Sequence, residues 1–401
     1  MKEIKTVRWR PKAAAPTADF GWEQARRARA FHSSFPEYAF TPLVRLQNLA
    51  RTLGVRDIFV KDESKRFGLN AFKVLGGSYA IGWEIAKIFG LGIEDMTYEL
   101  LTSPQVRERL GQLTFVTATD GNHGRGVAWT AQKLGQRAVV YMPKGSAQER
   151  LHNIRSLGAE AEITDVNYDD AVRLARRYAD KHGGIVVQDT SWEGYEEIPL
   201  HIMQGYTTMA YEIAEQLAAL GDVRPTHVFL QAGVGAMAGA VTGFLADYYK
   251  DDLPEIIIVE PLNAACLHKT AQAADGALHT VGGDLQSIMA GLCCGEPCSL
   301  GWRQLAAHAD VFPAVPDEVA ALGMRVLGNP VSGDAPVISG ESGAAGLGLA
   351  AAALRERELS GLKRQLALDG DAVILCISTE GATDLANYRS IMWEGAWSWN
   401  K

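Results

Sequence analysis

A lysine early in the chain lies in an unusually apolar setting. In the stretch "GLNAFKVLGGSYA", Lys73 stands between Phe72 and Val74 and precedes Gly76 and Gly77. An ammonium group is strongly hydrated, so such a lysine either reaches water along its alkyl stem or serves as a desolvated, reactive amine. The second role is that of an amine that forms a Schiff base with a carbonyl compound. The lysine alone leaves both interpretations open.

Three glycine-bearing turns add polar groups where predicted strands end. The first, "QAGVGAMAGA" at 231–240, opens a helix and offers backbone amides that suit a phosphate group, from Gly233, Val234, Gly235, Ala236 and Met237. The second, "TDGNHGRG", offers amides and side chains for a carboxylate and a phenolic oxygen, from Thr119, Asp120, Gly121, Asn122 and His123. The third, "CISTEGATD" at 376–384, presents the hydroxyl groups of Ser378 and Thr379.

The first turn also supports a different class of enzyme. Its glycines fit the dinucleotide-binding pattern Gly233-x-Gly235-x-x-Ala238, and Glu260 ends the next predicted strand, where an acid that binds ribose belongs. An NAD-dependent oxidoreductase is therefore an alternative function. The turn could also serve strand–helix packing alone.

The elements that position these groups alternate between β-branched runs and helical patterns, which predicts an α/β fold. We expect two domains, each a mostly parallel twisted sheet covered by helices. The larger would comprise residues 1–88 and 195–401, the smaller residues 89–194, and the active site would lie between them. The sequence predicts helices at 73–90 and 127–135 and strands at 56–63, 113–120, 137–143, 159–165, 184–190, 227–231, 255–261 and 371–379.

The composition is that of an ordinary globular protein. The chain has 401 residues, 47% hydrophobic and 21% charged, and a formal net charge of −8. Without a basic tract, nucleic acid is not expected as a partner. Gln231 and several glycines interrupt the most apolar long window, so we expect no membrane span. An odd number of cysteines and no signal-peptide pattern favour reduced thiols and a cytoplasmic location. No metal site is expected, because no set at zinc spacing completes "CCGEPC".

Taken together and in this order, Lys73 and the three turns resemble fold-type II pyridoxal-phosphate enzymes, the group of the tryptophan synthase β subunit. The segments "NAFKVLGGSYA", "TDGNHGRGVAW", "VQDTSWEGY", "GLCCGEP" and "STEGATD" are most similar to the diaminopropionate ammonia-lyases. The similarity extends over most of the chain, roughly residues 40 to 390.

The resemblance implies pyridoxal 5'-phosphate as cofactor and a role for each motif. Lys73 would form the Schiff base, and the amides of residues 233–237 would hold the phosphate. Asn122 would face the ring oxygen of the cofactor, and Ser378 or Thr379 would bond its pyridine nitrogen. A neutral hydroxyl there suggests a weaker electron sink than a carboxylate would give, which suits β-elimination.

The implied reaction is the α,β-elimination of ammonia from 2,3-diaminopropionate, which gives pyruvate and ammonia. The β-ammonium group needs a counter-charge, and this would explain Asp120, whose other interpretation is a helix N-cap. Asp189 is the candidate second carboxylate, although it could be a solvated acid that closes a strand. With Lys73 as base on one face and Asp120 on the other, both enantiomers would react.

A threonine or serine dehydratase, or a β-replacing enzyme with the same cofactor, is the alternative within this class, but neither gives a reason for Asp120. The family suggests a homodimer. The tryptophans of the C-terminal segment "MWEGAWSWNK" could pack at a subunit interface or against their own domain. Whether Cys266 and Cys294 form a disulfide is left open by the sequence.

Overall fold

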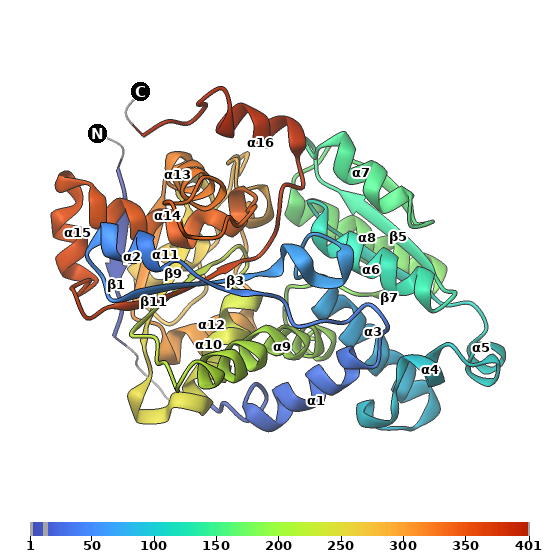
Figure 1. Cartoon of the computed structure of the whole chain (residues 1–401). Coiled ribbons are helices and arrows are strands. Elements are labelled where there is room, and N and C mark those ends of the chain that lie inside the picture. The colour runs from blue at the N-terminus through green and yellow to red at the C-terminus, as the bar shows by residue number, and fades with distance from the viewer. Residues whose placement is uncertain (1–2, 11–14, 400–401) are drawn as a thin grey trace.

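Two β-sheets organise the chain, which a computed structural model describes for residues 3–10 and 15–399 (Figure 1). The larger sheet has the strand order β1-β10-β9-β8-β11-β3-β2, and the smaller has the order β6-β5-β4-β7. Within the larger sheet, β1 and β2 run antiparallel to their neighbours, and the remaining pairs in both sheets are parallel. The strands are β1 (Lys5–Arg8), β2 (Leu43–Arg45), β3 (Asp57–Asp62), β4 (Thr114–Ala118), β5 (Arg137–Met142), β6 (Glu160–Ile163), β7 (Ile185–Val186), β8 (His227–Gln231), β9 (Glu255–Pro261), β10 (Val311–Val315) and β11 (Val373–Ser378).

Helices cover both faces of each sheet. They are α1 (Trp22–Ser33), α2 (Gln47–Leu53), α3 (Val74–Phe89), α4 (Tyr98–Leu101), α5 (Pro104–Leu110), α6 (Asn122–Lys133), α7 (Gln148–Arg155), α8 (Tyr168–His182), α9 (Glu197–Ala219), α10 (Ala236–Tyr249), α11 (Cys266–Ala273), α12 (Ser299–His308), α13 (Asp317–Gly328), α14 (Glu341–Arg355), α15 (Ser360–Gln365) and α16 (Leu385–Met392). A 3₁₀ segment, η1 (Glu63–Gly68), connects β3 with Lys73. The predicted α/β fold with mostly parallel, helix-covered sheets is confirmed.

The central strands are apolar on both faces, as parallel strands between two helical layers must be. Along β8, Val228 and Leu230 pack into the core that contains residues of α9 and α10, whereas Phe229 packs into the core that contains residues of α13 and α14. Figure 1 shows these two pairs of helices on opposite faces of the larger sheet. This continuous apolar character made the buried strands recognisable in the sequence.

The predicted start of the helix at 127–135 is wrong, since α6 already begins at Asn122. Glycine disfavours a helix on its own, but close packing requires it here. A Cβ on Gly124 would lie 2.4 Å from Cγ2 of Thr119, and one on Gly126 would lie 2.8 Å from Cα of Val74. The two glycines thus let α6 pack tightly against its own preceding strand end and against the first residue of α3.

Three strands were not predicted. The strands β1 and β2 are only four and three residues long and are partly exposed at the two edges of the larger sheet, so they lack a continuous apolar pattern. The strand β10, "VFPAV", is fully buried but carries a proline, which argues against a sheet interior.

Sheet membership follows the proposed domain division. The strands of the smaller sheet lie between Thr114 and Val186, within the range 89–194, and those of the larger sheet lie outside it. The boundary at residue 88 falls one residue before the end of α3, and the boundary at 195 falls two residues before the start of α9. The division itself stays a prediction.

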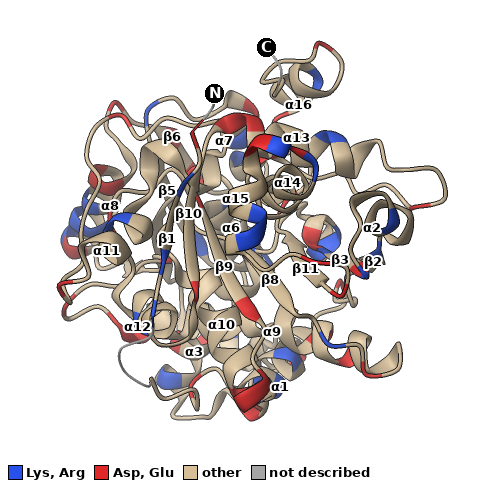
Figure 2. Ribbon diagram, turned by 90° about the vertical axis from the view of Figure 1, so that its left-hand side faces the viewer, with Lys and Arg blue, Asp and Glu red and all other residues tan. Residues whose placement is uncertain are grey.

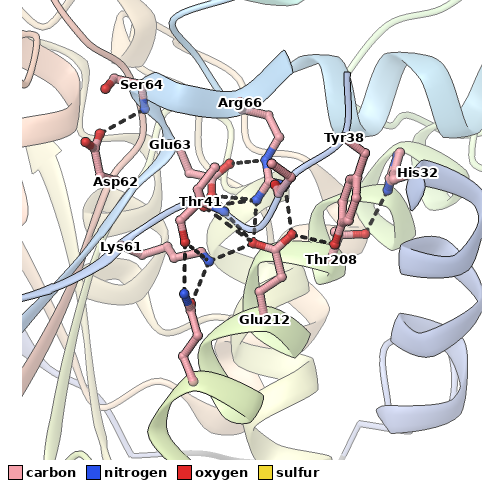
Figure 3. A network of polar contacts seen from close by, with 12 residues as sticks. His32, Tyr38, Thr41, Lys61, Asp62, Glu63, Ser64, Arg66, Thr208 and Glu212 are labelled. Atoms are coloured by element: carbon pink, nitrogen blue, oxygen red, sulfur yellow. Dashed lines mark hydrogen bonds and ion pairs between the residues drawn. The ribbon is translucent and has the colours of Figure 1, made fainter. Parts of the chain in front are cut away.

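A buried cluster of charges fixes the segment that leads from β3 to Lys73 (Figure 3). Lys61 on β3 donates to Glu212 on α9 at 2.6 Å, and Arg66 on η1 pairs with both Glu212 and Glu63 at 2.8 Å. All four side chains have no exposed surface. The two positive charges match the two negative charges, so the cluster can remain buried while it ties η1 to α9.

Charged residues of both signs are interspersed along the outer helices and loops (Figure 2). Within residues 3–10 and 15–399, none of the helices combines the length and apolar character that crossing a membrane requires.

Candidate active site

The carboxyl ends of strands from both sheets open on a cavity of about 780 Å³. Lys73 lies at this cavity, together with turns that follow β4, β7, β8 and β11. The predicted site residues that line it are Lys73, Thr119, Asp120, Asn122, His123, Asp189, Gly233, Val234, Gly235, Ala236, Met237 and Thr379. Gly121 and Ser378 were also predicted and do not contribute to the lining.

Lys73 directs its ammonium group to Asp189 rather than to bulk water. Nζ of Lys73 forms an ion pair with Oδ2 of Asp189, and the two side chains are 19% and 4% exposed. Burial alone would lower the pKa of Lys73, but the charge of Asp189 holds that pKa above its ordinary value. Burial would raise the pKa of Asp189, but the charge of Lys73 holds it below its ordinary value. The pair is therefore charged at neutral pH.

Two further groups surround this ion pair. Tyr168 donates its hydroxyl to Oδ1 of Asp189 at 3.3 Å, and Nδ1 of His123 lies 4.0 Å from Oδ2. Nε2 of His123 lies 2.7 Å from the carbonyl oxygen of Val187, which can only accept, so Nε2 carries the hydrogen. Because burial lowers the pKa of His123, the ring is neutral and Nδ1 is a free acceptor beside Asp189.

The turn at 119–122 has the geometry of an anion-binding helix start. The backbone N–H of Gly121 donates to Oγ1 of Thr119 at 2.9 Å, and α6 begins at the next residue, Asn122. Gly121 has a φ of 153°, and a Cβ there would lie 2.8 Å from Cδ of Arg150. The first amides of a helix have no partner within it, so this turn can hold the carboxylate of a substrate.

Asp120 does not cap the following helix. Gly121 is the N-cap of α6, and no side chain accepts its first amides. Oδ2 of Asp120 instead accepts a hydrogen bond of 2.7 Å from Nη1 of Arg150 on α7. The N-cap interpretation of Asp120 is therefore wrong, and the carboxylate lies at the cavity with a cation beside it.

The turn after β8 fits a phosphate group. Gly235 has a φ of +95°, which an L side chain rarely adopts, and α10 begins at Ala236. A Cβ on Gly233 would lie 3.1 Å from Sγ of Cys294 and 3.2 Å from Cα of Leu292, so glycine keeps this approach open. The amides at the start of α10 then face the cavity without side chains in the way, as a bound phosphate requires.

Of the two hydroxyl groups at the end of β11, only that of Thr379 faces the cavity. Nε2 of Gln231 donates to Oγ1 of Thr379 at 2.8 Å, which leaves the hydroxyl hydrogen of Thr379 available to another acceptor. Ser378 is fully buried and donates to Oγ of Ser339 at 2.8 Å. A ring nitrogen in the cavity can thus be reached by Thr379.

Further polar residues that were not predicted line the cavity, among them Arg150, Tyr168, Glu341 and Glu380. Glu380 accepts a hydrogen bond of 2.5 Å from Nδ2 of Asn122. Its position directly after the buried "CIST" strand was a usable signal, since charged groups at strand ends point to sites. Arg150 and Tyr168 lie in ordinary polar helices, where nothing local marks them.

Glu260, the acid that a dinucleotide-binding site would use to bind ribose, is already engaged in hydrogen bonds with the backbone. Glu260 is fully buried and accepts the backbone N–H groups of Leu267 at 2.8 Å and His268 at 2.7 Å. Burial raises the pKa of Glu260 to about 8. This carboxyl group satisfies the start of α11, so the glycine pattern at 233–238 has no ribose-binding partner there.

The five cysteines, all within the described residues, carry free thiols. Sγ of Cys266 lies 3.7 Å from the carbonyl oxygen of Gly233 and is not bonded to Cys294. The part of the chain that the structure describes contains no group of three or more His, Cys, Asp or Glu residues that could hold a metal ion.

The fold and this cavity define an enzyme class. Residues 35–379 match the family model described as pyridoxal-phosphate dependent enzyme, and the chain belongs to this family. The cofactor class that the motifs suggested is thereby confirmed.

Relatives place the chain more narrowly. It is 55% identical over 377 residues to diaminopropionate ammonia-lyase of Escherichia coli (strain K12), a match that covers 94% of this chain and 93% of the relative. The crystal structure of the Escherichia coli enzyme in complex with D-serine has a TM-score of 0.91 and 50% identity, covering 99% and 98% of the two chains. The structure of that enzyme with an aminoacrylate-PLP azomethine reaction intermediate has a TM-score of 0.90 and 50% identity, covering 99% of each chain. The resemblance to the diaminopropionate ammonia-lyases is confirmed.

Proposed function

We propose that this chain is a pyridoxal-phosphate dependent lyase that eliminates ammonia from 2,3-diaminopropionate and yields pyruvate and ammonia. Its identity to diaminopropionate ammonia-lyase over nearly the whole chain supports this activity. The structural observation that carries it is the position of Asp120. This carboxylate lies in the turn that can bind the substrate carboxylate and lines the same cavity as Lys73. A substrate with a second ammonium group needs such a counter-charge.

The cofactor would be held by groups from both sheets. Lys73 would carry it, the amides of residues 233–237 would bind its phosphate, and Asn122 would face its ring oxygen. Thr379 rather than Ser378 would donate to its pyridine nitrogen, because only Thr379 lines the cavity. When bound, pyridoxal phosphate supplies the electron sink that makes the α-proton of an amino acid acidic.

The acid–base work would fall to three residues of this chain. Lys73 would take the α-proton from one enantiomer, and Asp120 would take it from the other. Asp189 would keep Nζ of Lys73 oriented and compensate its charge while it carries a proton. With the neutral hydroxyl of Thr379 at its ring nitrogen, the cofactor would be a weaker electron sink than with a carboxylate partner there. This favours reactions in which the leaving group accepts the electrons.

A substrate panel tests the proposal. The purified protein should release pyruvate and two equivalents of ammonia from both D- and L-2,3-diaminopropionate, and much less product from serine or threonine. Borohydride reduction followed by peptide mass mapping should locate the cofactor on Lys73. The dehydratase alternative predicts the reverse order, with pyruvate from serine or 2-oxobutyrate from threonine as the main products.

The remaining proposals concern assembly and location. We propose a homodimer, which the exposure of both Trp393 (78%) and Trp397 (43%) in one short segment supports, because neighbouring exposed apolar side chains mark protein contacts. Sedimentation as a monomer would refute it. The five free thiols support a cytoplasmic location. The division into residues 1–88 with 195–401 and residues 89–194 is supported by sheet membership, and limited proteolysis would test it.

A further inference from the structure

Arg150 is the charged group most closely associated with Asp120. It projects from α7 and is 6% exposed, and its Nη1 donates to Oδ2 of Asp120 at 2.7 Å. Its alkyl chain lies so close to the turn that a Cβ on Gly121 would come within 2.8 Å of Cδ. A guanidinium that is buried, packed and bonded in this way restricts the rotation of the carboxylate it holds.

The same arginine reaches across to the larger sheet. Its Nη2 donates to Oγ1 of Thr383 at 3.2 Å, in the segment that follows β11. In that segment Glu380 accepts from Thr383 at 3.3 Å and from Asn122 at 2.5 Å. Both ends of the turn at 120–122, which follows β4 of the smaller sheet, are therefore tied to residues 380–383, which follow β11 of the larger sheet.

We propose that Arg150 is a positioning residue that fixes Asp120 for proton transfer and thereby sets the activity on the D-enantiomer. By holding Oδ2 it leaves Oδ1 for the substrate. This inference rests on the proposed function, in which Asp120 serves one enantiomer and Lys73 the other. Lys73 has its own partner, Asp189, and does not depend on Arg150 for its orientation.

Other groups near Asp120 do not replace Arg150. Lys73, His123, Tyr168 and Cys293 also interact electrostatically with it. Lys73 is committed to Asp189, and burial keeps His123 neutral and raises the pKa values of Tyr168 and Cys293. Arg150 is therefore the cation that anchors this carboxylate.

The test compares two substitutions of Arg150 with a matched control on the same helix. Arg150→Met removes the guanidinium but keeps an alkyl chain against Gly121, and Arg150→Lys keeps the charge but loses the fork that joins Asp120 and Thr383. Arg155→Met is the control, since Arg155 is exposed on α7. For each variant, kcat and KM are measured with D- and L-2,3-diaminopropionate, together with the visible absorbance of the bound cofactor and the melting temperature.

We expect Arg150→Met to lower kcat for the D-substrate by roughly 10- to 100-fold, the effect of a base misplaced by about 1 Å. In Arg150→Met the ratio of D- to L-activity should fall at least roughly tenfold, while the absorbance of the bound cofactor stays as in the wild type. In the control Arg155→Met the activity ratio and the absorbance should both stay as in the wild type. Arg150→Lys should recover part of the D-activity. If Arg150→Met does not fold, a fall in the D to L ratio of Arg150→Lys supports the proposal, and an unchanged ratio overturns it.

An equal loss for both enantiomers, or no loss for either, overturns the positioning role, because a merely structural arginine would affect both reactions alike. Pyruvate production by the wild type distinguishes failure of this inference from failure of the proposed function. If the wild type produces no pyruvate from either enantiomer, the proposed function itself is wrong. If it does so and the ratio is insensitive to Arg150, only the present inference is wrong.

Discussion

Glu212→Gln tests whether the buried charge cluster behind Lys73 stabilises the fold. The substitution keeps the size of the side chain and removes one of two negative charges. Lys61 and Arg66 would then share only Glu63, and one positive charge would remain buried without compensation. Because all these side chains have no exposed surface, solvent cannot screen the imbalance.

The structure gives the size of the effect. Burial would raise the pKa of Glu212, but the charges of Arg66 and Lys61 lower it from 4.5 to about 2. At about 1.4 kcal/mol per pH unit, this difference contributes about 3 kcal/mol to the free energy of unfolding at neutral pH. The loss expected when one partner of a buried ion pair is removed, about 3–5 kcal/mol, is of the same size.

The sign of the pH dependence follows from the lowered pKa. A carboxyl group whose pKa is lower in the folded state stabilises the fold above its unfolded pKa and loses this effect as the pH falls. The wild type should therefore lose this contribution between pH 4.5 and about 2, and the variant should lack that component. Burial already lowers the pKa of Lys61, so the variant can release that proton, and its deficit should be smaller at pH 9 than at pH 7.

The assay is urea unfolding followed by tryptophan fluorescence and far-UV circular dichroism, with coincident transitions as the condition for extracting a free energy. Glu215→Gln, one turn further along α9 and only half-buried, is the matched control and should differ little from the wild type. A loss below about 1 kcal/mol for Glu212→Gln, or a loss equal to that of the control, would refute the reasoning.

Three further predictions concern the site residues and the helix packing that positions them. Asp120→Asn should lower turnover of the D-substrate by roughly two to four orders of magnitude and turnover of the L-substrate less. Lys73→Ala should abolish turnover of both substrates. Near-normal rates for Asp120→Asn with both enantiomers would contradict the role of Asp120 as a base. Asp189→Asn should lower the pKa of Lys73, because the substitution removes the negative charge that raises this pKa. Uptake of pyridoxal phosphate by the apo-protein should then reach its maximum at a lower pH than in the wild type. An unchanged pH profile would contradict the role of Asp189. Gly126→Ala should cost about 1–3 kcal/mol in thermal unfolding, because its Cβ would lie 2.8 Å from the backbone of Val74, and Gly77→Ala, with 3.4 Å of clearance, should cost less.

The sequence predicted the parts of the fold that are locally encoded. Strands such as β8 and β9 are buried on both faces and read as short apolar runs, so their existence and direction could be inferred. The start of α6 could not, because Gly124 and Gly126 are placed in a helix by packing against Thr119 and Val74 rather than by propensity. The edge strands β1 and β2 were missed since pairing, not burial, defines them.

In the candidate site, too, the locally encoded features could be predicted and those that depend on tertiary packing could not. Lys73, the two glycine turns and the Ser378–Thr379 segment could be proposed from the sequence, because each carries an unusual residue type next to a strand or a helix start. The choice between Ser378 and Thr379 required the structure, because successive strand residues point to opposite sides and the sequence does not say which side bears the cavity.

The order of the strands determines which charged side chains surround the reacting groups. Asp189 follows β7 and the turn at 119–123 follows β4, and these strands are parallel neighbours whose carboxyl ends meet at one edge. The glycine-mediated contact of α6 with Val74 brings Lys73 to the same edge, 116 residues away in sequence from its partner Asp189. Asp120 and Arg150 are likewise 30 residues apart. Each candidate for proton transfer thus depends on a partner from another element. It follows that Lys73 with Asp189, and Asp120 with Arg150, should behave as two coupled pairs, in which a double substitution costs less than the sum of its single substitutions.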